Sequence, residues 1–255
     1  MKFNSYAAPA SPDEVVALLE KRNNRIVAGN LWLRLSRCAG GTQIDLKNLG
    51  WDQIEETDDA YLIGASVTLH MLETHPGLNK MTGDLFAEGL RDIVGVQFRN
   101  AATVGGSLYM RAGFSDLLTM LLPLDTTVLL YPEKEIPLAE YARLTPAGEL
   151  IRGVRIPKQE VRVAYRALRN TAGNVPVLTC AVAMRGGALY AAIGARPLRA
   201  ELIGGPNESS ESLTEKLALL TYGTNRAASE AYRRHVAGVL FSRCVTEIKG
   251  EEARV

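Results

Sequence analysis

The chain has 255 residues, of which 47% are hydrophobic and 22% are charged, and its formal net charge is +1. This is the composition of a globular protein, and so small a net charge predicts neither a nucleic-acid partner nor attraction to an anionic membrane. No segment reaches the roughly 20 consecutive apolar residues of a membrane helix, and the N-terminus lacks the apolar core of a secretory signal. We therefore expect a cytoplasmic protein of one or two domains.

Hydrophobic periodicity predicts mixed helices and strands over the first two thirds of the chain. A first helix is expected over 11–22, because Pro12 suits a first turn and Ser11 or Asp13 can cap it. Further helices are expected at 79–90 and 116–122, and strands at 25–29, 44–46, 60–68, 126–131, 149–157 and 161–169. Within the third strand, Gly64 indicates a bulge or a close approach of two backbones.

The last third of the chain has a different pattern. Two strands and two helices are expected there, at 177–185, 188–195, 209–221 and 227–248. The pair Gly186-Gly187 joins the two strands and favours a hairpin. The order of elements predicts an α+β fold with segregated parts, and not the repeated βαβ units of a Rossmann domain. We expect one domain over 1–170 and a second, of hairpin and helices, over 171–255.

The first segment that points to a ligand follows the strand at 25–29. It consists of Ile26, Val27, Ala28, Gly29, Asn30, Leu31, Trp32 and Leu33. Glycine at the end of a strand allows the backbone to adopt positive φ and to approach a ligand closely. Successive N–H groups in such a turn form a nest suited to a pyrophosphate. The alternative is an ordinary turn, which Ala-Gly-Asn after a strand also forms.

The second segment lies at 100–108. Its adjacent glycines, Gly105 and Gly106, would expose more backbone N–H groups, and they are flanked by the hydroxyls of Thr103 and Ser107. Because a dinucleotide carries two phosphates, it needs donors from more than one side. The two glycine segments together therefore predict a dinucleotide site better than either does alone.

Asp116 follows Gly106 by ten residues and begins an apolar helix. Either Ser115 or Asp116 can cap that helix. An acidic side chain beside a phosphate-binding loop has a second use, which is to accept hydrogen bonds from sugar or ribityl hydroxyls.

A third glycine pair, in Ala39-Gly40-Gly41-Thr42, looks more like a phosphate loop than 26–33 does. It precedes a strand instead of following one, so we interpret it as a plain loop.

The ordered set of segments resembles one known family. A strand ending in Ala-Gly-Asn is followed by IDL, YLIGASVT, RNAATVGGSL and, ten residues after the glycines, SDL. The similarity continues through ELIRGVRIP, ALYAAIGARPLRA and RAASEAYRRHVAGVLFSRC. This order resembles the FAD-binding domain of molybdenum hydroxylases, such as xanthine dehydrogenase and the medium subunit of carbon monoxide dehydrogenase. Each motif is loose, but the collinear set covers nearly the whole chain.

The resemblance implies a vanillyl-alcohol-oxidase-like (PCMH-type) FAD-binding fold with a C-terminal α/β cap domain. It also implies a role in electron transfer within a molybdenum hydroxylase complex. Electrons would pass from the [2Fe–2S] clusters of an iron–sulfur subunit through FAD to NAD or another acceptor. A molybdopterin-binding subunit would hydroxylate the substrate, by analogy xanthine or a related purine or N-heterocycle. The resemblance assigns no catalytic acid or base to this chain.

The same resemblance assigns contacts residue by residue. Residues 26–33 would wrap the FAD pyrophosphate with their backbone amides. A second pyrophosphate loop is implied at Thr103, Gly105 and Gly106, with the neighbouring Ser107. Asp116 would bind FAD hydroxyls. Contacts near the isoalloxazine are implied at Ile93, Ile151 and Arg166. Some relatives have an aromatic residue at the position of Ile93 and a Lys at the position of Arg166.

Two other functions stay open. One is a free-standing flavin reductase or oxidase that needs no partner. The other is a non-enzymatic assembly subunit with a degenerate site, an idea favoured by Asn30, Ile93 and the bulky Tyr109-Met110-Arg111 after the second glycine pair.

The three cysteines, Cys38, Cys180 and Cys244, are far apart in the sequence and odd in number. They predict no disulfide framework, and we expect isolated buried thiols. An iron–sulfur cluster needs about four thiolates, and three scattered cysteines do not supply them. The histidines, His70, His75 and His235, show no metal-binding spacing.

Overall fold

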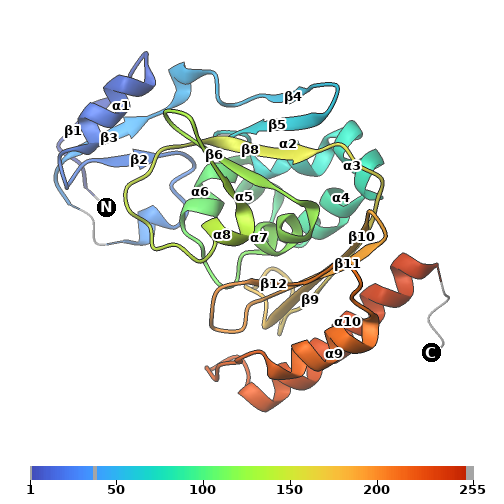
Figure 1. The fold of residues 1–255 in the computed structure, drawn as a ribbon. Helices are drawn as coiled ribbons and strands as arrows, with labels where there is room; N and C mark the ends of the chain where they lie inside the picture. Colours follow the sequence, from blue (N-terminus) through green and yellow to red (C-terminus); the bar gives the residue numbers. More distant parts are fainter. Residues whose placement is uncertain (1, 37–38, 251–255) are drawn as a thin grey trace.

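The computed structural model describes residues 2–36 and 39–250. Their strands form three sheets, and a layer of short helices fills the space between the two larger sheets (Figure 1). None of the helices in these two ranges is long and apolar enough to cross a membrane. The predicted mixture of helices and strands in segregated parts is confirmed.

The N-terminal sheet is small and parallel, with the strand order β1-β3-β2. Its elements are β1 (Ser5–Ala7), α1 (Pro12–Leu19), β2 (Arg25–Val27) and β3 (Thr42–Asp45), followed by the 3₁₀ helix η2 (Lys47–Leu49). Ser11 caps α1, since its side chain accepts a hydrogen bond from the Glu14 amide. Val15 and Ile44 pack together in a small core of their own. The sheet carries the strand that leads into Gly29.

The largest sheet is antiparallel and has the order β4-β5-β8-β6-β7. Its strands are β4 (Ile54–Glu56), β5 (Ala60–Gly64), β6 (Thr127–Leu130), β7 (Lys134–Pro137) and β8 (Ile151–Pro157). Gly64 makes the predicted close approach, because a Cβ atom there would lie 2.1 Å from the Trp51 carbonyl oxygen. Alternate residues such as Ile63 and Val154 point into the main core.

Short helices cover the inner face of this sheet. They are α2 (Leu69–Thr74), α3 (Pro76–Thr82), α4 (Leu85–Arg91), α5 (Val96–Ala101), α6 (Val104–Tyr109), α7 (Asp116–Leu121), η3 (Leu122–Leu124) and α8 (Leu138–Tyr141). The predicted single helix at 79–90 is wrong, because Gly83 and Asp84 both have positive φ and separate α3 from α4. Apolar residues of the helices, among them Leu90 and Leu118, complete the main core.

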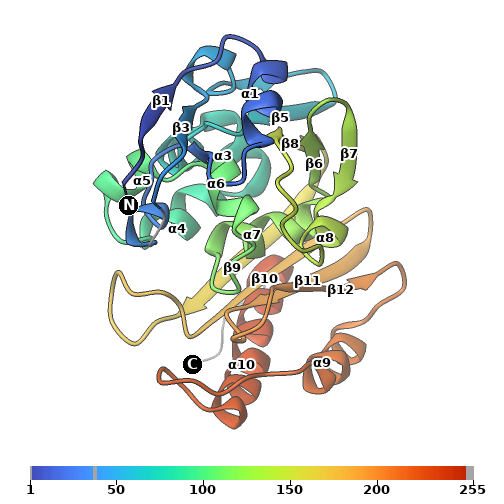
Figure 2. The ribbon, with the colours of Figure 1, turned by 90° about the vertical axis from the view of Figure 1, so that its left-hand side faces the viewer.

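The C-terminal part is a four-stranded antiparallel sheet with two helices. Its elements are β9 (Val161–Leu168), β10 (Leu178–Arg185), β11 (Ala188–Gly194), β12 (Glu201–Gly205), α9 (Ser210–Leu219) and α10 (Glu230–Lys249). Both views place α9 and α10 on the face of this sheet that is turned away from the helical layer (Figure 2). The predicted hairpin is confirmed, with Gly186 and Gly187 at φ +54° and +73°. Strand β9 lies before residue 170 and pairs with β10, so the sheet spans the predicted domain division.

The two described cysteines are buried, as predicted, but they are not isolated from each other. Cys180 lies on β10 and Cys244 on α10, and the Cys244 thiol is 3.9 Å from the Cys180 carbonyl oxygen. The helix packs on the sheet at this point, which brings the two positions together. Cys38 lies outside the described residues.

Candidate functional site

The turn after β2 has a row of backbone donors without partners. Within the described part of the chain, the N–H groups of Gly29, Asn30, Leu31 and Trp32 donate to no protein acceptor. Asn30 has a left-handed backbone, with φ +58°, and its Oδ1 atom is buried without a hydrogen-bond partner. Buried polar groups in folded proteins are nearly always paired. The turn therefore has the unmet polar groups of a ligand site, and the 3₁₀ helix η1 (Leu33–Leu35) follows it.

Gly29 brings this turn against the second predicted segment. A Cβ atom at position 29 would lie 1.7 Å from the carbonyl oxygen of Ala101, at the end of α5. Only glycine permits two backbones to approach so closely. The two segments that the sequence singled out are thus in direct contact, with the row of free N–H groups beside their junction.

The second segment is not the open loop that the sequence suggested. Thr103 is the N-cap of α6, and its Oγ1 accepts from the Gly106 amide at 3.2 Å. The Gly105 amide donates to the Ala65 carbonyl at 2.8 Å, and a Cβ atom on Gly105 would lie 2.8 Å from the Ala65 Cβ. Gly105 therefore serves close packing of α6 against the end of β5. Because the Ser107 amide bonds to the Thr103 carbonyl, all these donors are in use.

Gly106 differs from Gly105 in its surroundings. It is exposed, and a Cβ atom there would have Thr103 Oγ1, at 3.1 Å, as its close neighbour. A side chain at this position therefore has room in the protein itself. Gly106 is therefore free to approach a ligand closely.

An aromatic pair that the sequence did not single out borders the first turn. Trp32 is 45% exposed, and its ring lies 5.3 Å from that of Phe114, tilted by 54°. The preceding Gly113 packs against the backbone of Leu198, which belongs to the segment after β11. Phe114 therefore lies against the first turn, and the neighbouring Gly113 lies against the C-terminal part of the chain. No periodicity in the sequence marks Phe114, because it stands in an irregular connection.

Asp116 is buried, and it is not the cap of α7. That role belongs to Ser115, whose Oγ accepts from the Leu118 amide at 3.1 Å. The Asp116 Oδ1 atom accepts from the Tyr165 hydroxyl and from the Arg169 guanidinium. Burial raises the pKa of the Asp116 carboxyl, while Arg169 and Tyr165 act in the opposite direction. Sequence reasoning found Asp116 but missed both partners.

The three residues assigned to the flavin ring have different surroundings. Ile151 begins β8 and is buried in the main core, and Ile93 is half-buried against the same core. Arg166 lies on the opposite face of β9 from Tyr165 and pairs with Glu247 of α10. Among the described residues, the partners of Arg166 are the Tyr165 carbonyl and Glu247, so its predicted role in flavin binding stays a prediction.

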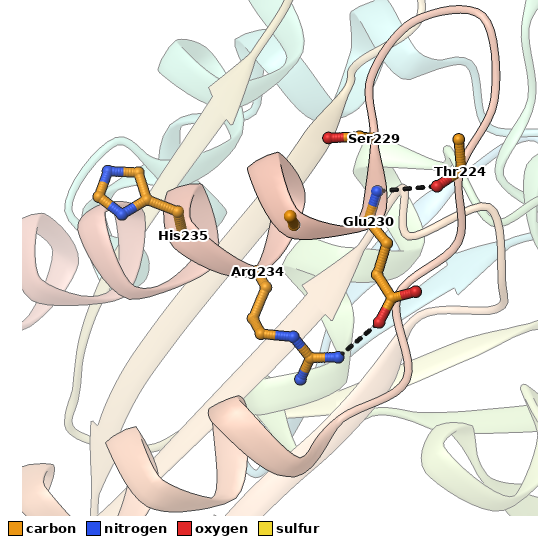
Figure 3. A pocket seen from close by; sticks show the side chains of 6 residues that line it. Thr224, Ser229, Glu230, Arg234 and His235 are labelled. Carbon is orange, nitrogen blue, oxygen red and sulfur yellow. Dashed lines mark hydrogen bonds and ion pairs between the residues drawn. The ribbon is translucent and has the colours of Figure 1, made fainter.

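A separate depression lies at the N-terminal end of α10 (Figure 3). It is open, has a volume of about 600 Å³, and is lined by Thr224, Ser229, Glu230, Ala231, Arg234 and His235. Its polar groups bond to one another, since the Glu230 amide donates to Thr224 Oγ1 at 2.9 Å and Arg234 pairs with the Glu230 carboxylate at 2.8 Å. These partners satisfy one another, and the depression shares no residue with the predicted site.

A family model described as the FAD-binding domain in molybdopterin dehydrogenase matches residues 1–159. The chain belongs to this family. Its cofactor is accordingly FAD, and the resemblance inferred from the ordered motifs is confirmed. As a member of this family, the chain is part of an oxidoreductase.

The chain is similar in fold to two solved structures and in sequence to one further protein. The fold is similar to quinoline 2-oxidoreductase from Pseudomonas putida 86, with a TM-score of 0.81 and 22% identity over 96% of this chain and 97% of the other. It is also similar to a reconstituted CO dehydrogenase from Oligotropha carboxidovorans, with a TM-score of 0.84 and 22% identity over 98% of both chains. The uncharacterized protein YgfM of Escherichia coli K12 is 25% identical over 217 residues, which is 82% of each chain. The structural likenesses establish the fold.

The residues present fit FAD. A pyrophosphate carries several acceptor oxygens, and the turn at 29–32 offers four free backbone donors in succession. The Asn30 side chain lies on the same turn, and its buried Oδ1 atom has no hydrogen-bond partner. Trp32 on the same turn and Gly106 on the second segment are both exposed.

Proposed function

We propose that this chain is the FAD-binding electron-transfer subunit of a molybdenum hydroxylase complex. It would receive electrons from the [2Fe–2S] clusters of an iron–sulfur subunit and deliver them to NAD or another acceptor, while a molybdopterin-binding subunit acts on the substrate. The family match and the fold shared with CO dehydrogenase and quinoline 2-oxidoreductase support this role. The observation that carries it is the row of unpaired N–H groups from Gly29 to Trp32.

When bound, FAD supplies the redox chemistry, and the protein binds and orients it. The backbone amides of residues 29–32 would hold the pyrophosphate, with Gly106 on its other side. Asp116 would accept a hydrogen bond from a cofactor hydroxyl. In this proposal the electrons come from another polypeptide, because the sequence contains three cysteines, fewer than the roughly four thiolates of a cluster.

The substrate of the complex follows only from analogy. We propose xanthine or a related purine or N-heterocycle, since one structural relative is named for quinoline, an N-heterocycle. We also propose that the chain works in the cytoplasm, and its small net charge of +1 favours partners other than nucleic acid.

Purification of the natural complex tests the proposal. A tagged chain expressed in its native host should co-purify with a molybdopterin-binding subunit and an iron–sulfur subunit, and acid denaturation should release one FAD per chain into the supernatant. FMN in the supernatant would contradict the pyrophosphate argument. Recovery of a flavin-loaded chain without the two partners would favour a free-standing reductase or oxidase instead.

A second candidate function has one observation in its favour. The amides of Gly105 and Gly106 are occupied within α6, which leaves the second glycine pair without the free donors of a phosphate loop. A degenerate subunit kept for assembly would have this feature. A chain that co-purifies with its partners but carries no flavin absorbance would support that alternative.

A further inference from the structure

The Asp116 carboxylate uses its two oxygens unequally. Oδ1 accepts both from the Tyr165 hydroxyl and from the Arg169 guanidinium. Oδ2 accepts no hydrogen bond from another residue in the described part of the chain, and it is not among the buried polar atoms that lack a partner. One oxygen is therefore anchored by two neighbouring side chains, and the other is free of bonds to other residues in this part of the structure.

Burial of the Asp116 carboxylate costs free energy, and its place at the start of α7 does not explain why it is buried. Ser115 already caps α7, so the helix does not need the neighbouring carboxylate. Asp116 is 7% exposed, and burying a charged group costs free energy even when it is paired. A buried carboxylate with a perturbed pKa and one oxygen free of other residues is a candidate for ligand binding.

Arg169 also contacts a second segment of the chain, the connection between β9 and β10. Its Nη1 donates to the Asn174 carbonyl at 2.8 Å, in the connection between β9 and β10. Within that connection, the Asn174 side chain donates to Thr171 Oγ1 at 2.8 Å. Gly173 has φ +77° and faces the Val94 backbone, since a Cβ atom on it would lie 3.7 Å from the Val94 oxygen. Arg169 thus joins Asp116 to a connection that lies beside Val94, next to Ile93.

On the basis of the proposed function, we propose that Arg169 is a positioning residue for the cofactor. It fixes the Asp116 carboxylate so that Oδ2 accepts from a ribityl or sugar hydroxyl of FAD. Through Asn174, it also couples cofactor binding to the order of residues 170–176. Tyr165 supports the same oxygen of Asp116 from β9.

The charge of Asp116 depends on this pair of partners. Burial raises the pKa of the carboxyl, and the titratable and charged side chains that act on it are Arg169 and Tyr165. Cys180 of β10, which pairs with Arg166 on the other face of the sheet, is among the groups that raise the pKa of Tyr165. Without Arg169, Asp116 would be protonated up to a higher pH. A neutral carboxyl is a weaker acceptor than a carboxylate for a cofactor hydroxyl.

The test is the affinity of the full-length apoprotein for FAD, measured from about pH 6 to about pH 9. Arg169→Met should weaken binding about ten- to a hundredfold near neutral pH, and its affinity should rise with pH as Asp116 ionises. In the wild type that rise should lie at lower pH. Arg162→Met is the matched control, because Arg162 is an exposed residue of β9, the strand that Arg169 directly follows. An Arg169→Met profile that matches this control would overturn the proposal.

Two further variants separate positioning from folding. In an Asp116→Asn background, Arg169→Met should produce no additional pH dependence, because the titrating group is gone. Arg169→Lys keeps the charge but offers fewer donors. It should retain a profile near that of the wild type, while FAD no longer protects residues 170–176 from hydrogen exchange. Equal protection of that segment in the wild type and in Arg169→Lys would contradict the coupling.

The outcomes also distinguish this inference from the proposed function. If the wild-type chain binds no FAD at any pH, the proposed function fails. If the wild type binds FAD and Arg169→Met binds it equally well at every pH, only the role of Arg169 fails.

Discussion

The backbone of Gly29 lies against the carbonyl group of Ala101, with room for no side chain between them. A Cβ atom at position 29 would lie 1.7 Å from the Ala101 oxygen. The contact joins the turn after β2 to the end of α5. The geometry of the free donors at 29–32 depends on it.

Gly29→Ala should therefore displace the turn and abolish FAD binding. Because the added carbon meets backbone and not a flexible side chain, it cannot be accommodated by a rotamer change. We expect loss of the flavin spectrum and a lower melting temperature. The control is Gly238→Ala in α10, where a Cβ atom has no neighbour within 4 Å among the described residues. It should keep the flavin spectrum and the melting temperature of the wild type. A Gly29→Ala chain that binds FAD like the control would show that this turn is not part of the site.

Gly106→Val should lower FAD affinity while the protein stays folded. The position is exposed, and only Thr103 Oγ1, at 3.1 Å, is close to an added Cβ atom. The helix itself is not weakened, because valine has a higher helix propensity than glycine. Gly238→Val makes the same change of propensity in α10 and should leave FAD affinity unchanged. Gly41→Val is unsuitable as a control, since its Cβ would lie 2.2 Å from the Asn23 oxygen. Equal affinities of the Gly106 and Gly238 variants would place the cofactor elsewhere.

Arg233→Met should destabilise the C-terminal part strongly. The Arg233 side chain is 1% exposed, and its guanidinium donates to three carbonyl groups and to the Asn225 side chain. Removing it leaves buried acceptors unpaired, which we expect to cost about 3 kcal/mol. Urea denaturation measures the loss. Arg243→Met, at an exposed position of the same helix, should change the free energy of unfolding by less than about 0.5 kcal/mol.

Glu149 should contribute stability that depends on pH. Burial raises the pKa of its carboxyl, but bonds from the Ala147 amide, Arg111 and Tyr141 outweigh it, and the net pKa lies below the usual 4.5. A lowered pKa in the folded state stabilises the protein above the unfolded-state pKa, and this contribution is lost as the pH falls through the folded-state value. Glu149→Gln should thus be less stable than the wild type at pH 7. The difference should shrink below about pH 4.5, and a difference that is constant with pH would contradict the assignment.

The sequence predicted the parts of the site but not how they meet. Gly29 was found because a strand ending in glycine has a local signature, and Asp116 because it begins an apolar helix. The contact between Gly29 and Ala101 could not be predicted, since it joins residues far apart in the chain. Helix α6 was missed because Gly105 and Gly106 have low helix propensity and look like a loop. Gly105 is suited to this helix because α6 lies directly against Ala65 at that position.

The sequence also does not show which of two neighbouring arginines points toward the candidate site. Arg166 and Arg169 are both polar residues near the end of β9, and the sequence does not assign them to a face. The sheet turns Arg166 toward Glu247 of α10 and Arg169 toward Asp116. Short edge strands such as β1, β4 and β12 were also missed, because three to five residues give little periodicity.

Electron transfer into the flavin of this chain is the central claim, and anaerobic reconstitution tests it most directly. The purified chain is mixed with its iron–sulfur and molybdopterin-binding subunits, substrate is added without oxygen, and the flavin absorbance is followed. We predict that the absorbance bleaches in the complete mixture, and that the chain alone hydroxylates no substrate. A flavin that stays oxidised in an active complex, or turnover by the isolated chain, would contradict the account.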